Sequence, residues 1–205
     1  MTAIEYIHGA DDEAIARWLE ARLADALEGS AGIAVTLPGG STPFPILSEL
    51  AHAPLDWDRV SIWPGDDRIV AEDHPASNAG RIRALLEPAG AKVIPLAQDA
   101  TPPHFALTWL GMGNDGHIAS LFPNIDPRAD DPLAMRRITP DPLPPEAPFD
   151  RLSLTIPALL DTDALVFVLR GEDKRKAFEA AARGESDLPV ARLLGAATVP
   201  VTCFT

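Results

Sequence analysis

The chain is organised around residues 105–123, which read Phe105-Ala-Leu-Thr-Trp-Leu-Gly-Met-Gly-Asn-Asp-Gly-His117-Ile-Ala-Ser-Leu-Phe-Pro123. The apolar run at residues 105–110 predicts a buried strand, and the loop after it places three glycines, an aspartate and a histidine within seven residues. Glycines at this density let a backbone bend sharply and approach a ligand closely. An imidazole beside a carboxylate can transfer protons near neutral pH. We therefore expect His117 and Asp115 to lie at a ligand site.

A second strand and turn precede this stretch. Residues 32–37 form a continuous apolar run, which is typical of a buried parallel strand, and they lead into Pro-Gly-Gly-Ser-Thr-Pro at 38–43. We expect Thr42 to cap the next helix, with Pro43 at its first position. A glycine turn that opens a helix can cradle a phosphate, because its amides and the helix dipole favour anions. An ordinary strand-to-helix turn accounts for the pattern equally well.

Charged residues follow the next predicted strand, residues 60–63. Asp66, Asp67 and Arg68 stand where ligands bind in open α/β sheets, although a solvated charged turn is the alternative. Ser77 or Asn78 then caps a helix that carries two arginines at 81 and 83.

The remaining predicted elements alternate between strands and helices, apart from two consecutive strands at 136–139 and 151–155. We expect strands at 3–8, 92–96, 136–139, 151–155, 164–169 and 199–204, and helices from residue 11 or 12 to 27, at 172–183 and at 189–194. This order predicts one α/β domain over residues 1–205 with a largely parallel sheet. Only eight residues, 97–104, separate two of the strands. These strands are therefore not neighbouring parallel strands, or the connection between them is unusually short.

Composition excludes several classes of function. The 205 residues carry 17 Lys and Arg against 30 Asp and Glu, a formal net charge of −13, so non-specific nucleic-acid binding is not expected. No stretch approaches the about 20 apolar residues of a membrane span, and the first residues do not resemble a signal peptide. Cys203 is the only cysteine, and we expect a buried, inert thiol. The default expectation is a cytoplasmic monomer or weak dimer.

The central loop also permits other interpretations. Residues 111–116 match Gly-x-Gly-x-x-Gly, but Pro123 stops the helix that a dinucleotide site requires, and the residues near 130, where an acid should end a second strand, are rich in proline and aspartate. No Gly-x-Ser-x-Gly elbow is present, and the five histidines lack zinc-site spacing. We expect neither cofactor nor metal. A histidine-centred site remains, suited to hydrolysis by activated water or to proton shuttling on a sugar.

Several motifs together resemble one known family. They are Gly39-Gly-Ser-Thr-Pro43, Asp66-Asp-Arg68, Ser77-Asn78, Asp115-Gly-His-x-Ala-Ser-Leu-Phe-Pro123, Arg151-Leu-Ser-Leu-Thr155 and Gly171-x-x-Lys174. The chain resembles the family of glucosamine-6-phosphate isomerases/deaminases and 6-phosphogluconolactonases. Residues 120–123 favour the lactonase branch, whereas Asp67 departs from the glutamate of most members. The resemblance implies a Rossmann-like, mostly parallel sheet flanked by helices with a small appended lobe, and no cofactor.

The reaction that the resemblance implies is hydrolysis of 6-phospho-D-glucono-1,5-lactone to 6-phospho-D-gluconate, the second step of the oxidative pentose phosphate pathway. Isomerisation or deamination of a sugar phosphate, or non-catalytic sensing, are the alternatives. Our hypothesis assigns the base to His117 and its orientation to Asp115, with Arg68 or loop amides stabilising the oxyanion. Further site residues are the catalytic candidate Asp66 and the substrate-binding candidates Gly39, Gly40, Ser41, Thr42, Arg83, Gly113, Arg151 and Lys174.

Overall fold

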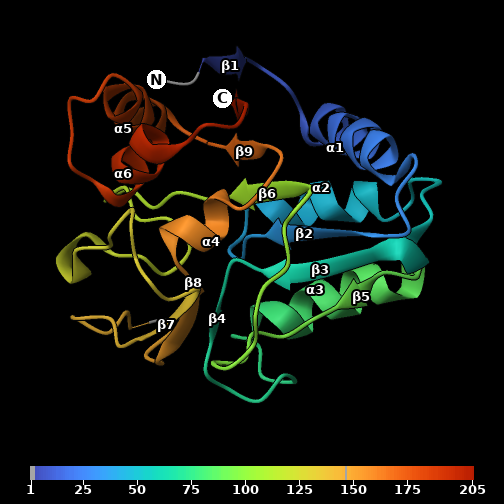
Figure 1. Ribbon diagram of the computed structural model, residues 1–205, viewed down its shortest axis with the longest axis horizontal. Helices are drawn as coiled ribbons and strands as arrows, with labels where there is room; N and C mark the ends of the chain where they lie inside the picture. Colours follow the sequence, from blue (N-terminus) through green and yellow to red (C-terminus); the bar gives the residue numbers. More distant parts are fainter. Residues whose placement is uncertain (1–2, 146) are drawn as a thin grey trace.

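The computed structural model describes residues 3–145 and 147–205 and contains two sheets. The larger sheet is parallel, with seven strands in the order β1-β10-β9-β6-β2-β3-β5 (Figure 1). Its strands are β1 (Ile4–Ile7), β2 (Ile33–Leu37), β3 (Val60–Pro64), β5 (Lys92–Val93), β6 (Leu107–Leu110), β9 (Leu165–Val168) and β10 (Val201–Phe204). The helices are α1 (Asp12–Leu27), α2 (Pro43–Leu50), α3 (Asn78–Leu86), α4 (Ile156–Leu160), α5 (Glu172–Ala182) and α6 (Pro189–Ala196).

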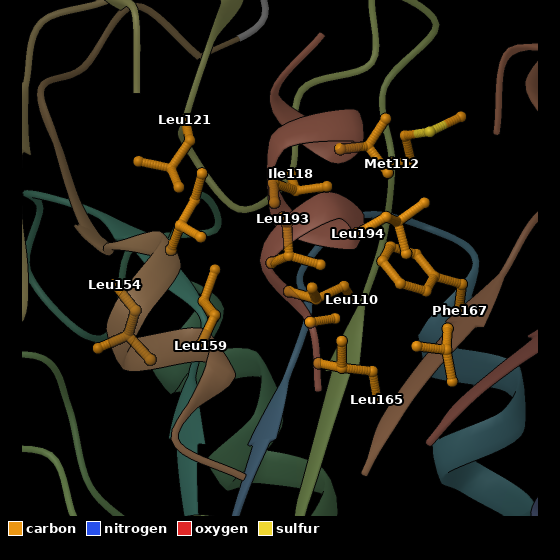
Figure 2. Packing of buried hydrophobic residues seen from close by; sticks show 14 of the residues in the cluster. Leu110, Met112, Ile118, Leu121, Leu154, Leu159, Leu165, Phe167, Leu193 and Leu194 are labelled. Atoms are coloured by element: carbon orange, nitrogen blue, oxygen red, sulfur yellow. The ribbon is translucent and has the colours of Figure 1, made fainter. Parts of the chain in front are cut away.

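Each central strand divides its side chains between two hydrophobic cores. In β9, Leu165 and Phe167 enter one core, and Val166 and Val168 enter the other. Strand side chains alternate between the faces of a sheet, so burial on both faces explains the unbroken apolar runs in the sequence. Helices α1, α2 and α3 cover the core that contains Val166 and Val168. Helices α4, α5 and α6 cover the core that contains Leu165 and Phe167. Figure 2 shows the second of these, where residues of α6 and the 111–121 loop pack together.

The helix signals in the sequence are mostly confirmed. Asp11 caps α1 by accepting from the Ala14 N–H at 2.8 Å, and Ser77 caps α3 by accepting from the Gly80 N–H at 3.0 Å. Thr42 occupies the predicted cap position of α2, but its side chain caps no N–H among the residues described. The reason is backbone geometry: Thr42 is already helical, with φ −63° and ψ −43°, whereas a side-chain cap needs an extended residue.

The short connection between residues 92 and 107 is explained by the strand order. Strand β5 lies at the edge of the sheet, and both β3 and β2 stand between it and β6. The two strands are therefore not neighbours, the first of the two alternatives. Strand β5 is also shorter than the predicted 92–96, because regular pairing with β3 ends at Val93.

The appended lobe is a small antiparallel sheet in the order β4-β8-β7. It comprises β4 (Asp66–Arg68), β7 (Met135–Ile138) and β8 (Arg151–Leu154), and three short 3₁₀ helices elsewhere complete the fold, Trp57–Arg59, Glu87–Ala89 and Pro123–Ile125. Gly65 alone separates β4 from β3, so the chain passes directly from the large sheet into the small one. The antiparallel register sets Arg68 opposite Arg151. This confirms the predicted α/β fold with its small lobe.

Two further observations bear on function. Cys203 is fully buried in β10, and burial raises the pKa of its thiol to about 12, as expected for an unreactive cysteine. Within the described ranges, no helix combines the length and the apolar character needed to cross a membrane.

Candidate active site

The loops that follow β2, β3, β6 and β9 surround one cleft with a volume of about 360 Å³. That volume lies in the range of about 300–1,000 Å³ found for small-ligand sites. Because these strands are parallel, the loops after them meet at the same edge of the sheet. Ten predicted site residues line the cleft, namely Gly39, Gly40, Ser41, Thr42, Asp66, Arg68, Gly113, His117, Arg151 and Lys174.

The His117 imidazole is held in one orientation by its own loop. Its Nδ1 lies 2.6 Å from Asp115 Oδ1, and the Gly113 N–H donates to the His117 carbonyl at 2.9 Å. An ionised carboxylate only accepts hydrogen bonds, so Nδ1 carries the proton and Nε2 of the neutral ring keeps its lone pair. The ring also packs against Phe122, with 4.8 Å between centroids. The loop therefore presents a proton acceptor to the cleft.

Two positions of this loop require glycine for steric reasons. A Cβ on Gly113 would lie 2.2 Å from the His117 ring and 2.6 Å from Asp115 Oδ1, so only glycine lets the imidazole lie over the backbone. Gly116 has φ +76°, a left-handed conformation that favours glycine. These constraints explain the glycine density in the sequence without a dinucleotide.

Asp66 is held by a residue of the same central stretch. Ser120 Oγ donates to Asp66 Oδ2 at 2.5 Å, and the Ser120 N–H donates to Ser153 Oγ at 3.2 Å. Ser120 is only 2% exposed, whereas Asp66 is half-buried and lines the cleft. The preceding Ala119 has φ +49°, a strained conformation for a residue with a Cβ. The structure thus joins the histidine loop to the small sheet through one buried residue, Ser120.

The Asp67 carboxylate anchors the small sheet to the start of α3. It accepts from the N–H groups of Asn78 at 2.6 Å and Ala79 at 2.9 Å, and from Ser77 Oγ at 3.2 Å. Burial raises the pKa of the Asp67 carboxyl, and the N–H groups of Ala79 and Asn78 oppose that rise. The short aspartate side chain suffices here because β4 lies close to the helix end.

Asn78 connects three parts of the cleft. Its Nδ2 donates to the Asp66 carbonyl at 2.8 Å, and its Oδ1 accepts from Arg68 Nη1 at 3.4 Å. A Cβ on Gly39 would lie 2.1 Å from the same Oδ1, so this glycine makes room for the amide. The close fit sets the glycine turn of residues 39–42 against the charged strand β4.

Three cations, Arg68, Arg151 and Lys174, line the cleft, although the protein as a whole is acidic. Arg151 is 4% exposed and donates from Nη2 to the Ala147 carbonyl at 3.1 Å. Arg68 donates to the Ala76 carbonyl at 2.9 Å, while its buried Nε has no hydrogen-bond partner in the described chain. Lys174 lies in the first turn of α5, where a cation opposes the helix dipole. This arrangement favours an anionic ligand.

The family-level comparison agrees with this geometry. The model of the family described as glucosamine-6-phosphate isomerases/6-phosphogluconolactonase matches residues 11–102 and 87–201. The chain belongs to this family.

Curated relatives support the family assignment, and a solved structure shows the same fold. The 6-phosphogluconolactonase of Mesorhizobium japonicum is 36% identical over 213 residues, which cover 91% of this chain and 88% of the relative. That of Neisseria meningitidis serogroup A is 34% identical and covers 89% of this chain and 88% of the relative. The crystal structure of the 6-phosphogluconolactonase from Thermotoga maritima superposes with a TM-score of 0.82 over 100% of this chain and 99% of the other. At 22% identity this last similarity shows the fold alone.

Arg83 is the predicted site residue that the structure places elsewhere. Its guanidinium pairs with Glu72 and Glu87 and donates to the Val93 carbonyl at 3.1 Å, and these carboxylates raise its pKa. It lies outside the cleft as lined by the described residues, and Asp66 is held by Ser120 rather than by Arg83. The structure therefore does not bring Arg83 to the cleft with the other predicted substrate-binding residues. Arg83 lies one helical turn from the helix end, on the side that faces β5.

Sequence reasoning missed the roles of Asn78 and Ser120. The sequence predicts Asn78 only as a helix cap, and Ser120 only as part of the motif that separates lactonases from deaminases. The signal for both was their position in motifs of the family, but their partners lie 12 and 54 residues away along the chain. Among the described residues, no cluster of three or more His, Cys, Asp or Glu side chains is arranged to hold a metal ion.

Proposed function

We propose that this chain hydrolyses 6-phospho-D-glucono-1,5-lactone to 6-phospho-D-gluconate. The observation that carries the proposal is His117, oriented through Nδ1 by Asp115, in a cleft that also contains the glycine turn and the cations. The names of the relatives at 34–36% identity support the same reaction.

The proposed mechanism uses His117 twice. Nε2 first takes a proton from water while the water oxygen bonds to the lactone carbonyl carbon, which gives a tetrahedral oxyanion. The bond from that carbon to the ring oxygen then breaks, and the imidazolium returns the proton to the departing oxygen as the sugar hydroxyl. The new carboxylic acid loses its own proton to solvent. Asp115 keeps Nε2 available for both transfers and stabilises the transient imidazolium.

The oxyanion needs positively polarised groups at the moment it forms. Arg68 is our candidate, because it is a cation that lines the cleft and not all of its N–H groups have a hydrogen-bond partner in the described chain. Such a donor contributes roughly 3 kcal/mol to the stabilisation of the transition state. Asp66, held by Ser120 and lining the same cleft, is our candidate for orienting the hydroxyl groups of the sugar.

The phosphate group is assigned to the turn of residues 39–42. Gly40 adopts φ +88°, which turns the peptide sharply before the amino end of α2. Free N–H groups at a helix start, together with two hydroxyls, form a ready anion site. Lys174 and Arg151, which line the same cleft, supply the counter-charges.

One assay tests the proposal. Glucose 6-phosphate is oxidised enzymatically to the lactone, and acid release is followed with and without the protein to correct for spontaneous hydrolysis. We expect wild type to accelerate acid release and His117→Asn to lower kcat at least about 100-fold with little change in KM. His104→Asn, on the surface, serves as the control. Wild-type kcat in His117→Asn would refute the assignment of the base. Ammonia release or aldose–ketose conversion would instead indicate the isomerase activity, and binding without turnover a sensor.

A further inference from the structure

Arg81 contacts the glycine turn from outside the cleft, and the proposed function leaves it unused. It lies in the first turns of α3, and its guanidinium carbon stacks 3.7 Å from the ring centroid of Phe44, the second residue of α2. Its Nη1 also donates to the Gly40 carbonyl at 3.4 Å. One exposed side chain thus connects α3, α2 and the turn between β2 and α2.

The positive charge of Arg81 lies in an unfavourable electrostatic environment. In the part of the chain that the structure describes, it has no carboxylate partner, whereas Arg83, two residues later, has two. A cation near the start of a helix opposes the dipole. Partial burial, and then the positive charge of Arg68, lower the pKa of Arg81. An anion bound at the turn would offset the unfavourable interactions of the Arg81 charge with the helix dipole and with Arg68.

The contact with Gly40 also has a consequence for backbone geometry. In a trans peptide the carbonyl oxygen and the following N–H point in opposite directions. A Gly40 carbonyl held toward Arg81 therefore leaves the Ser41 N–H on the side away from Arg81. Both Gly40 and Ser41 line the cleft. The aromatic ring of Phe44 keeps the planar guanidinium in place for this contact.

We propose that Arg81 is a positioning residue for the substrate phosphate: stacked on Phe44, it orients the Gly40–Ser41 peptide and adds positive charge behind the turn. The proposal rests on the proposed function, because it assumes that the phosphate binds at residues 39–42. The side chain acts through the turn and the electrostatic field. It therefore affects affinity for the phosphorylated end of the ligand and not the chemistry at the carbonyl.

The test compares Arg81→Met and Arg81→Lys with wild type. For each, kcat and KM are measured on 6-phosphogluconolactone and on unphosphorylated glucono-1,5-lactone, and inorganic phosphate is titrated as a competitive inhibitor. We expect Arg81→Met to raise the KM for the phosphorylated lactone and the phosphate inhibition constant about three- to tenfold, an effect that shrinks with added salt. Its kcat, and all values for the unphosphorylated lactone, stay at the wild-type level. Arg81→Lys recovers most of the affinity, because it keeps the charge.

Arg22→Met is the matched control. Arg22 also stacks on an aromatic ring, Trp18 at 5.1 Å, but on α1 and away from the cleft. Unchanged KM in Arg81→Met, or an equal loss on both lactones, would overturn the proposal, and the second result would indicate a merely structural role. Failure of the proposed function looks different, because wild type itself would then hydrolyse neither lactone. In that case, inorganic phosphate binding to wild type and Arg81→Met still decides the role of Arg81.

Discussion

Replacing Gly113 with alanine places a methyl carbon where the His117 ring now lies. The new Cβ would be 2.2 Å from two ring atoms, Cε1 and Nδ1, and protein Cβ atoms essentially never come within 3.0 Å of a neighbour. Gly113 does not have a positive φ, so alanine fits its backbone and the imidazole must move instead. Restoring an ordinary contact displaces the ring by about 1 Å, and such a misplacement of a catalytic group costs about 100-fold in rate.

We therefore expect Gly113→Ala to lower kcat about 100-fold, equivalent to about 2.7 kcal/mol of activation free energy, in the lactone assay. KM and the thermal midpoint change little, because the phosphate turn and the core are untouched. Gly111→Ala is the control from the same loop, since its Cβ would meet Pro38 Cβ at 3.7 Å, an ordinary contact. Near-wild-type kcat in Gly113→Ala, or an equal loss in Gly111→Ala, would refute this reasoning.

Three further predictions concern the cleft and the surface. Lys174→Ala removes a cation from the proposed phosphate site and should raise KM for the phosphorylated lactone about tenfold, measured by steady-state kinetics. Ser120→Ala releases Asp66 and should lower kcat about tenfold, because the carboxylate loses the hydroxyl that orients it. His104 lies between Asp161 and a second aspartate, whose hydrogen bonds raise its pKa above 6.5. The stability from this raised pKa is complete below pH 6.5 and is lost as the pH rises through the folded-state value. Urea unfolding from pH 5.5 to 8.5 should show this loss, at most about 1 kcal/mol for so exposed a group, and His104→Asn should remove it.

Each of these predictions has a contradicting outcome. An unchanged KM in Lys174→Ala would remove that residue from the phosphate site, and Lys174→Arg, which keeps the charge, is its control. Wild-type kcat in Ser120→Ala would show that Asp66 needs no orienting hydroxyl, with Ser120→Thr as the conservative comparison. The same pH dependence of stability in wild type and His104→Asn would exclude the surface histidine as its source.

The sequence by itself determines which segments form strands and helices, where helices begin, and the contacts within the loop of residues 111–123. The unbroken apolar run at residues 164–169 contains β9 and places alternate side chains in both cores, so the run alone predicts a strand buried on two faces. Asp11 and Ser77 begin their helices through side chains that reach three residues ahead. The loop from Gly111 to Pro123 forms close contacts within itself, and the pairing of Asp115 with His117 is therefore readable from adjacent residues.

Only the tertiary structure decided which long side chains serve the cleft. Arg81 and Arg83 look alike in the sequence, yet one stacks over Phe44 beside the glycine turn and the other pairs with Glu72 and Glu87. They differ because α3 presents residues two apart on different faces, and the strand order decides what each face meets. Likewise, Ser120 reaches Asp66 only because parallel strands bring their carboxyl ends to one edge. Backbone periodicity is set by neighbours in the chain, whereas a side chain's partners are set by segments that folding brings together from far away.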